Sequence, residues 1–168
     1  GVKGVLDRFG QIEPRVLVTC AGYYFKGRVI DIRDKVREIA SRLPTVERVV
    51  VVPYAIADLS DPGQIASSAV LFNDFRGEVG GETSAEVEFS QLPFDHPVYI
   101  MYSSGTTGLP KCMVQGPGVL LNHLKELALH TDVRPGDAVF YFTTCGWIMW
   151  NWRLSGLALG AHLVLYDG

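Results

Sequence analysis

Two short apolar runs flank an amphipathic segment in the first third of the chain. Residues 16–18 and 49–52 are apolar and largely β-branched, which is typical of buried strands. Between them, apolar side chains recur at the spacing of one helix face, and charged residues occupy the opposite face. The apolar face comprises Ile32, Val36, Ile39, Ala40 and Leu43. Because two apolar strands joined through one such helix run parallel, the pattern predicts a βαβ unit within residues 1–57.

Residues 58–93 have a different composition. Gly, Ser, Asp and Glu are frequent there, and the second half of the segment is acidic. The few side chains that look capable of packing are Ala69, Val70, Leu71, Phe72 and Phe75. We therefore expect a long connecting excursion that lies in solvent on the surface.

Apolar runs and helical patterns alternate again in residues 94–168. The expected strands are residues 98–102, 111–114, 139–142 and 162–166. The expected helices are residues 118–128 and 147–159. Strands that alternate with helices predict the α/β class, here a mostly parallel sheet with flanking helices.

Composition narrows the class of protein. With 15 Lys and Arg against 18 Asp and Glu, the net charge of -3 argues against a nucleic-acid binder. An apolar content of 48% with 11% aromatic residues supplies a core and excludes wholesale disorder. No apolar run approaches the roughly 18 residues that span a bilayer. These features predict a soluble protein with no membrane span.

The cysteines and histidines give little sign of special chemistry. Cys20, Cys112 and Cys145 are odd in number and lack the spacing of metal ligands, which indicates free thiols in a reducing compartment such as the cytoplasm. No metal-ligand spacing is found at His96, His123, His130 and His162 either, so no metal site is expected on this chain.

The two ends of the chain suggest that it belongs to something longer. It starts at Gly1 without Met and stops at Gly168, directly after a strand-like run. We expect neither end to be that of a complete domain, although a length of 168 residues is close to that of one domain.

The segment Ser103-Ser-Gly-Thr-Thr-Gly-Leu-Pro-Lys111 carries the most chemical information. Its glycines let backbone N–H groups approach a ligand closely, its hydroxyls donate to phosphate oxygens, and its lysine adds a positive charge. The segment follows an expected strand, where α/β sheets bind nucleotides. We therefore predict a phosphate-binding loop formed by Ser103, Ser104, Gly105, Thr106, Thr107, Gly108 and Lys111.

Two other interpretations of this loop differ in what they require of the sequence. It is not a Walker loop, because Leu and Pro separate Gly108 from Lys111 and Cys112 follows the lysine. A hydroxyl-rich surface hairpin without a ligand is the other alternative. It would have to account for six successive Ser, Thr and Gly residues between two apolar strands.

The loop resembles the phosphate-loop signature of the adenylate-forming superfamily of acyl-CoA synthetases, luciferases and adenylation domains. Further segments are similar to the acetoacetate-activating members of that superfamily: Phe94-Asp-His-Pro97, Lys111-Cys-Met-Val114, His123-Leu-Lys-Glu126 and residues 141–152. The resemblance covers nearly the whole chain and is densest from Leu92 onward. It implies part of the large N-terminal domain of such an enzyme.

The resemblance also implies a reaction and its small-molecule partners. An acid would attack the α-phosphate of ATP to give an acyl-adenylate and pyrophosphate, and the thiol of coenzyme A would then displace AMP. Acetoacetate is the implied acid, ATP and coenzyme A are the implied co-substrates, and the ligands of Mg²⁺ would lie outside this chain. Two alternatives stay open: a synthetase for acetate, propionate or another short acid, and a non-catalytic module that binds nucleotide phosphates.

Residue roles follow from the same resemblance. The predicted loop would hold the β- and γ-phosphates, and the acyl pocket would be lined by Gly146, Trp147, Ile148 and Met149. For Trp147, a place in a buried helix face is an equal alternative. Arg28, in a basic turn that contains glycine, would contact coenzyme A, although ordinary surface charge is a competing explanation. Cys145 is expected to be a packing thiol.

Parts of the family pattern find no counterpart in this chain. The adenine segment, the ribose-binding Asp, the hinge and the catalytic Lys of the family would lie beyond Gly168. We therefore expect that these 168 residues by themselves do not catalyse ligation.

Overall fold

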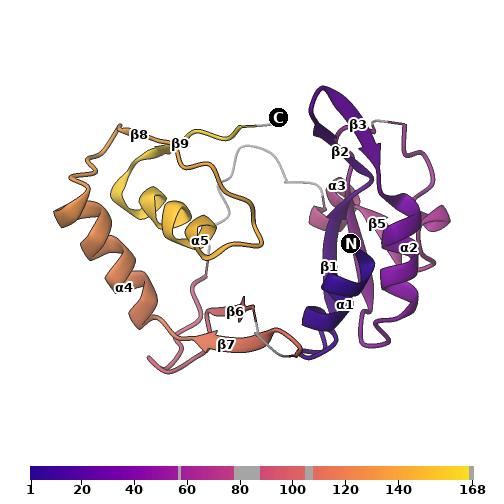
Figure 1. Cartoon of the computed structure of the whole chain (residues 1–168), viewed down its shortest axis with the longest axis horizontal. Helices are drawn as coiled ribbons and strands as arrows, with labels where there is room; N and C mark the ends of the chain where they lie inside the picture. Colours follow the sequence, from indigo (N-terminus) through magenta and orange to yellow (C-terminus); the bar gives the residue numbers. More distant parts are fainter. Residues whose placement is uncertain (57, 78–87, 105–107, 167–168) are drawn as a thin grey trace. The chain divides into compact units, whose positions relative to one another are not determined.

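The computed structural model describes residues 1–56, 58–77, 88–104 and 108–166, which fall into two compact units (Figure 1). Unit 1 consists of Gly1–Glu88 together with Ser104–Pro110. Unit 2 consists of Phe89–Ser103 and Lys111–Asp167.

A three-stranded parallel sheet forms the centre of unit 1. Its strands are β1 (Val16–Cys20), β4 (Arg48–Val52) and β5 (Ala69–Leu71), in the order β1-β4-β5. Helix α2 (Arg33–Ser41) connects β1 with β4, and Leu17 is paired with Val49 in the register of the two strands. The predicted βαβ unit is therefore confirmed.

A helix and a hairpin in the first 31 residues of unit 1 were not predicted. Helix α1 (Val2–Phe9) packs its apolar side chains against the core, and β2 (Gly22–Phe25) pairs with β3 (Arg28–Asp31) as an antiparallel hairpin between β1 and α2. The hairpin loop has only two residues, Lys26 and Gly27, both with positive φ. That geometry matches the twist of paired strands and favours glycine, which explains Gly27.

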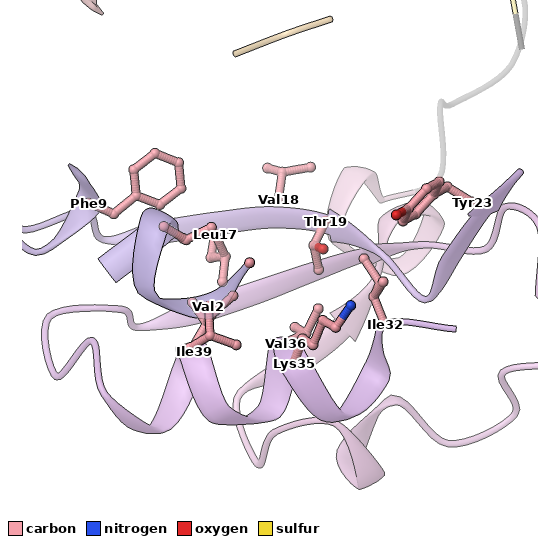
Figure 2. A pocket seen from close by; sticks show the side chains of 12 residues that line it. Val2, Phe9, Leu17, Val18, Thr19, Tyr23, Ile32, Lys35, Val36 and Ile39 are labelled. Carbon is pink, nitrogen blue, oxygen red and sulfur yellow. The ribbon is translucent and has the colours of Figure 1, made fainter. Parts of the chain in front are cut away.

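The core of unit 1 lies between the sheet and the helices that cover one of its faces. Leu17 and Val49 of the sheet are buried against Val36 and Ile39 of α2. A hollow of about 300 Å³ with mainly apolar lining remains between α1, β1 and α2. Figure 2 shows Val18 on the opposite side of β1 from Val36 and Ile39. At the edge strand β1, the face of the sheet that carries Val18 is therefore exposed.

The prediction that residues 58–93 form a solvated surface connection is wrong for the first half of that segment. Leu59 and Ile65 are buried in the core of unit 1, and β5 adds the third strand to the sheet. Two short helices, η1 (Pro62–Gln64) and α3 (Phe72–Arg76), flank that strand. Burial of a few scattered apolar side chains outweighs the polar composition, which a count of residue types does not reveal. The acidic residues 78–87 lie outside the described part.

Unit 2 begins with a hairpin and continues with helices. Strand β6 (Tyr99–Ser103) pairs antiparallel with β7 (Lys111–Gln115). The helices and a second small sheet follow in chain order: α4 (Gly118–Lys125), η2 (Glu126–His130, one π-helical turn), β8 (Ala138–Val139), α5 (Ile148–Leu154), η3 (Ser155–Leu159) and β9 (His162–Leu163). Strands β8 and β9 run parallel, and the α/β class is confirmed.

The strands expected at residues 139–142 and 162–166 are shorter than predicted. Between these two segments, ladder pairing is limited to Ala138 with His162 and Val139 with Leu163. Beyond it, the carbonyls of Tyr141 and Val164 accept hydrogen bonds from the side chain of Arg153. The guanidinium therefore takes up acceptors that a longer ladder would have used.

Among the described residues, no helix has the length and apolar character needed to cross a membrane.

Two valines that share one face of the sheet provide a matched test of this packing. Val18 and Val50 are paired in register, but Val50 is 0% exposed and Val18 is 61% exposed. We expect Val50→Ala to lower the free energy of unfolding by about 2 kcal/mol, because it deletes buried methyl groups. Val18→Ala should change it by less than about 0.5 kcal/mol. Urea-induced unfolding measures both, and equal losses would show that Val18 is covered.

Candidate functional site

The predicted phosphate loop connects the two strands of the β6–β7 hairpin. Ser103 at the end of β6 and Lys111 at the start of β7 are paired in register. The loop is therefore closed at its base by an antiparallel ladder. Gly105, Thr106 and Thr107 lie outside the described residues, and no geometry is assigned to them. The structure thus brings together the first and last residues of the motif.

The described loop residues face solvent to different degrees. Ser103 is half-buried, whereas Ser104, Gly108 and Lys111 are exposed. A Cβ at Gly108 would meet nothing within 4 Å, so this glycine is not required there for lack of space. The connection has the hairpin geometry of the ligand-free alternative. The phosphate-binding loop and the ligand-free hairpin are therefore distinguished by the chemistry of the connection, which places hydroxyl donors and a cation at an accessible turn.

The predicted acyl-pocket residues lie together at the start of α5. Trp147 is the N-cap residue of this helix, and its N–H donates to the carbonyl of Thr144 at 3.1 Å. Its side chain is 70% exposed, Ile148 is exposed and Met149 is half-buried. A buried helix face for Trp147 is therefore wrong, because the side chain lies at the helix start rather than on the side packed against the core. The role of these residues in an acyl pocket stays a prediction.

Within unit 2, one hydrogen bond joins helix α5 to strand β6. The amide of Asn151 on α5 donates to Sδ of Met101 on β6 at 2.8 Å. Met101 lies two residues before Ser103 on the same strand. The helix that carries the predicted acyl-pocket residues is thus attached to the strand that leads into the predicted phosphate loop.

Sequence analysis missed a buried arginine on the same helix. Arg153 is 3% exposed, and its Nη1 donates to the carbonyls of Tyr141 and Val164 at 3.0 and 3.3 Å. Its guanidinium carbon lies 4.6 Å from the centre of the Trp150 ring. The available signal was a single cation within the otherwise uncharged residues 138–166.

Two predictions about other residues have different outcomes. Arg28 follows the two-residue turn of the β2–β3 hairpin and is exposed, and a contact with coenzyme A stays a prediction. Cys145 is exposed, so the expectation of a packing thiol is wrong. It lies in the exposed turn before Trp147, so its side chain is not packed in a core. Burial raises the pKa of the Cys20 thiol, although backbone hydrogen bonds partly oppose this effect.

His123 is the buried histidine of unit 2. It is 5% exposed, and its Nδ1 lies 3.1 Å from Oγ of Ser155. Burial lowers the pKa of His123, and the nearby Glu126 carboxylate partly opposes this effect. The described residues contain no group of His, Cys, Asp or Glu side chains that could hold a metal ion. His123 is thus a structural residue that links α4 to η3.

The hollow in unit 1 is a packing feature rather than a polar site. Its lining is mainly apolar and includes Leu17, Ile32 and Val36. None of the residues predicted for the site lines it. The residues predicted for the phosphate loop and the acyl pocket lie in two other segments, the loop of the β6–β7 hairpin and the start of α5.

Comparison with known proteins assigns this chain to a family. The family model described as "AMP-binding enzyme" matches residues 4–168. The chain belongs to the AMP-binding enzyme family, which confirms the resemblance to adenylate-forming acyl-CoA synthetases.

Individual relatives are similar along the whole chain. Acetoacetyl-coenzyme A synthetase of Rhizobium meliloti is 49% identical over 171 residues, which cover 100% of this chain and 25% of that protein. Malonamoyl-CoA synthetase of Penicillium aethiopicum is 43% identical over 172 residues, with 100% and 24% covered. The solved structure of acetoacetyl-CoA synthetase from Streptomyces lividans has a TM-score of 0.85 and 44% identity, and covers 100% of this chain and 24% of that one. The chain spans about a quarter of the length of the curated relatives it matches.

The histidine environment predicts a pH dependence of stability. Because the folded-state pKa of His123 is below its ordinary value of about 6.5, the unfolded chain binds the proton more readily. Stability from the neutral imidazole is present above that ordinary value and is lost as the pH falls through the folded pKa. We expect the free energy of unfolding to fall less steeply on acidification in His123→Gln than in the unmodified chain. Urea unfolding at a series of pH values measures the slope.

His130→Gln is the matched control, because His130 is exposed at the end of η2. Its slope should equal that of the unmodified chain. Equal slopes for all three proteins would contradict the assignment to His123.

Proposed function

We propose that this chain supplies the phosphate loop and part of the acyl pocket of an ATP-dependent acid–thiol ligase. The observation that carries the proposal is the hydroxyl-rich loop between β6 and β7. Its ends are paired at Ser103 and Lys111, and it lies in a chain of the AMP-binding enzyme family. Hydroxyl donors and an ammonium group match the charge and the acceptor oxygens of a polyphosphate.

The proposed reaction has two steps. The carboxylate attacks the α-phosphorus of ATP, the bond to the pyrophosphate oxygen breaks, and an acyl-adenylate forms. The thiolate of coenzyme A then attacks the acyl carbon, and AMP leaves with the electron pair of the broken C–O bond. The first step turns a poor acyl donor into a good one, so the catalytic need is mainly positioning and charge stabilisation.

Each part of the chain has a defined task in this scheme. The loop residues Ser103, Ser104, Gly105, Thr106, Thr107, Gly108 and Lys111 hold the β- and γ-phosphates and the departing pyrophosphate. The start of α5, with exposed Trp147 and Ile148, contacts the acyl group. Arg28 in the β2–β3 hairpin contacts coenzyme A. We propose that the ligands of Mg²⁺ lie outside this chain.

The acid we propose is acetoacetate. The names of the Rhizobium meliloti and Streptomyces lividans relatives support it. Overall identity alone does not decide the acid, because the malonamoyl-CoA synthetase is 43% identical to this chain. The acid must be distinguished by measurement, since one or two side chains of a pocket set its size.

We also propose that the protein acts in the cytosol. The free thiols of Cys20 and Cys145 support a reducing compartment.

The loop proposal predicts a specific defect at Lys111. The test protein is a full-length chimera in which this chain replaces the matching quarter of the Rhizobium meliloti relative. We expect Lys111→Ala to lower acid-dependent ATP–pyrophosphate exchange about 100-fold, because a cation facing the developing phosphate charge is lost. Lys125→Ala is the control, since Lys125 is an exposed cation on α4 whose ammonium donates to Asn122. Equal activities of the two variants would remove Lys111 from the site.

The acid itself is tested with a panel. The chimera should exchange pyrophosphate fastest with acetoacetate and more slowly with malonamate, acetate, propionate and butyrate. A preference for another acid would keep the mechanism and discard acetoacetate. A folded chimera that binds ATP but exchanges with none of the acids would instead favour the non-catalytic module. The 168-residue chain alone should form no thioester.

A further inference from the structure

Arg153 is a buried cation with no acidic partner among the described residues. The ion pairs that the structure shows all involve other residues, and the Arg153 guanidinium contacts two main-chain carbonyls and the face of Trp150. Its Nε is buried with no hydrogen-bond partner in the described part of the chain. Burying a cation costs free energy that an apolar residue of similar size would not cost. The arrangement is therefore not explained by stability alone.

The two carbonyls place the guanidinium at the base of one loop. Tyr141 immediately precedes residues 142–147, which lead to Trp147, and Arg153 belongs to the helix that follows them. One side chain thus ties the entry of the loop to the helix at its exit. The second carbonyl, that of Val164, belongs to the chain just after β9. Charge-assisted hydrogen bonds of this kind are stronger than neutral ones.

Aromatic contacts reinforce the same connection. The Tyr141 ring lies edge-on to Trp152 at a centroid distance of 6.4 Å, and Trp152 Nε1 donates to the carboxylate of Glu126 at 3.1 Å. The Arg153 guanidinium over Trp150 gains from cation–π attraction. Both ends of the loop are therefore fixed on one helix, whereas Trp147 and Ile148 at its exit stay exposed.

We propose that Arg153 is a positioning residue for acid recognition, which fixes residues 142–149 through the Tyr141 carbonyl and helix α5. This inference rests on the proposed function, because it assumes that the start of α5 contacts the acyl group. Arg153 is not a catalytic residue, since it is buried behind the exposed side chains. Its loss would let the loop shift, and small displacements of contacting groups have large effects on rate.

The test compares Arg153→Met with the unmodified chimera defined above. Met keeps an apolar stem of similar length and removes the donors. We expect the KM for acetoacetate to rise about tenfold with a smaller change in kcat, because the loop orients the acid. The KM for ATP should change by less than about twofold, since the predicted phosphate loop connects β6 and β7 and does not contain the Arg153 contacts. The preference for acetoacetate over butyrate should also fall.

Two controls separate positioning from general destabilisation. Val133→Ala weakens the core that packs beneath α5, where Val133 is buried with Leu127 and Ala161. It should leave the acid preference unchanged. Arg153→Lys keeps the charge but loses the planar fork, so it should restore only part of the preference. If Val133→Ala shifts the acid preference as much as Arg153→Met does, the positioning role is wrong.

A second measurement does not depend on activity. Hydrogen–deuterium exchange of the amides in residues 142–150 should speed up about tenfold in Arg153→Met, because the loop opens locally, and should not in Val133→Ala. Unchanged exchange in a folded Arg153→Met chimera would overturn the inference. An inactive unmodified chimera would contradict the proposed function and leave this exchange test to decide the role of Arg153. If Arg153→Met does not fold, Arg153→Lys is measured in its place with the same criteria.

Discussion

The pairing of β6 with β7 is the interaction on which the candidate site depends. It joins Ser103 to Lys111 across the base of the loop, so residues eight positions apart become neighbours on adjacent strands. Hydroxyl groups and a cation that were separate along the chain thereby share one end of a hairpin. Without this ladder, the glycines that permit close backbone approach would also permit the loop to spread. The antiparallel ladder is therefore as important to the proposed chemistry as the polar residues themselves.

Helix α5 links this hairpin to the rest of unit 2. Asn151 contacts the sulfur of Met101 on β6, and Arg153 contacts the carbonyls of Tyr141 and Val164. Two polar side chains on this seven-residue helix thus contact strand β6, the segment before the helix at Tyr141 and the segment after it at Val164. A short helix has little stability of its own, so these contacts and the packing of its neighbours determine its position.

Unit 1 is organised by burial instead. Strand β4 lies in the middle of the parallel sheet, and Val49, Val50 and Val51 are all fully buried. Parallel sheets are normally covered on both faces. Here helix α2 and its neighbours pack on one face, but Val16 and Val18 on the outer strand remain exposed on the other.

The sequence by itself determined the α/β class and the βαβ unit, and it supplied the prediction of a phosphate loop between β6 and β7. Periodic burial and the conformational freedom of glycine are local properties, and they can be read from residue order. Only the tertiary structure decided that Leu59 and Ile65 belong to the core, that Trp147 faces solvent and that Arg153 is buried. Those outcomes depend on which distant surfaces exclude water from a side chain. Composition predicted that residues 58–93 lie in solvent, but Leu59 and Ile65 are buried in the core and β5 pairs with β4.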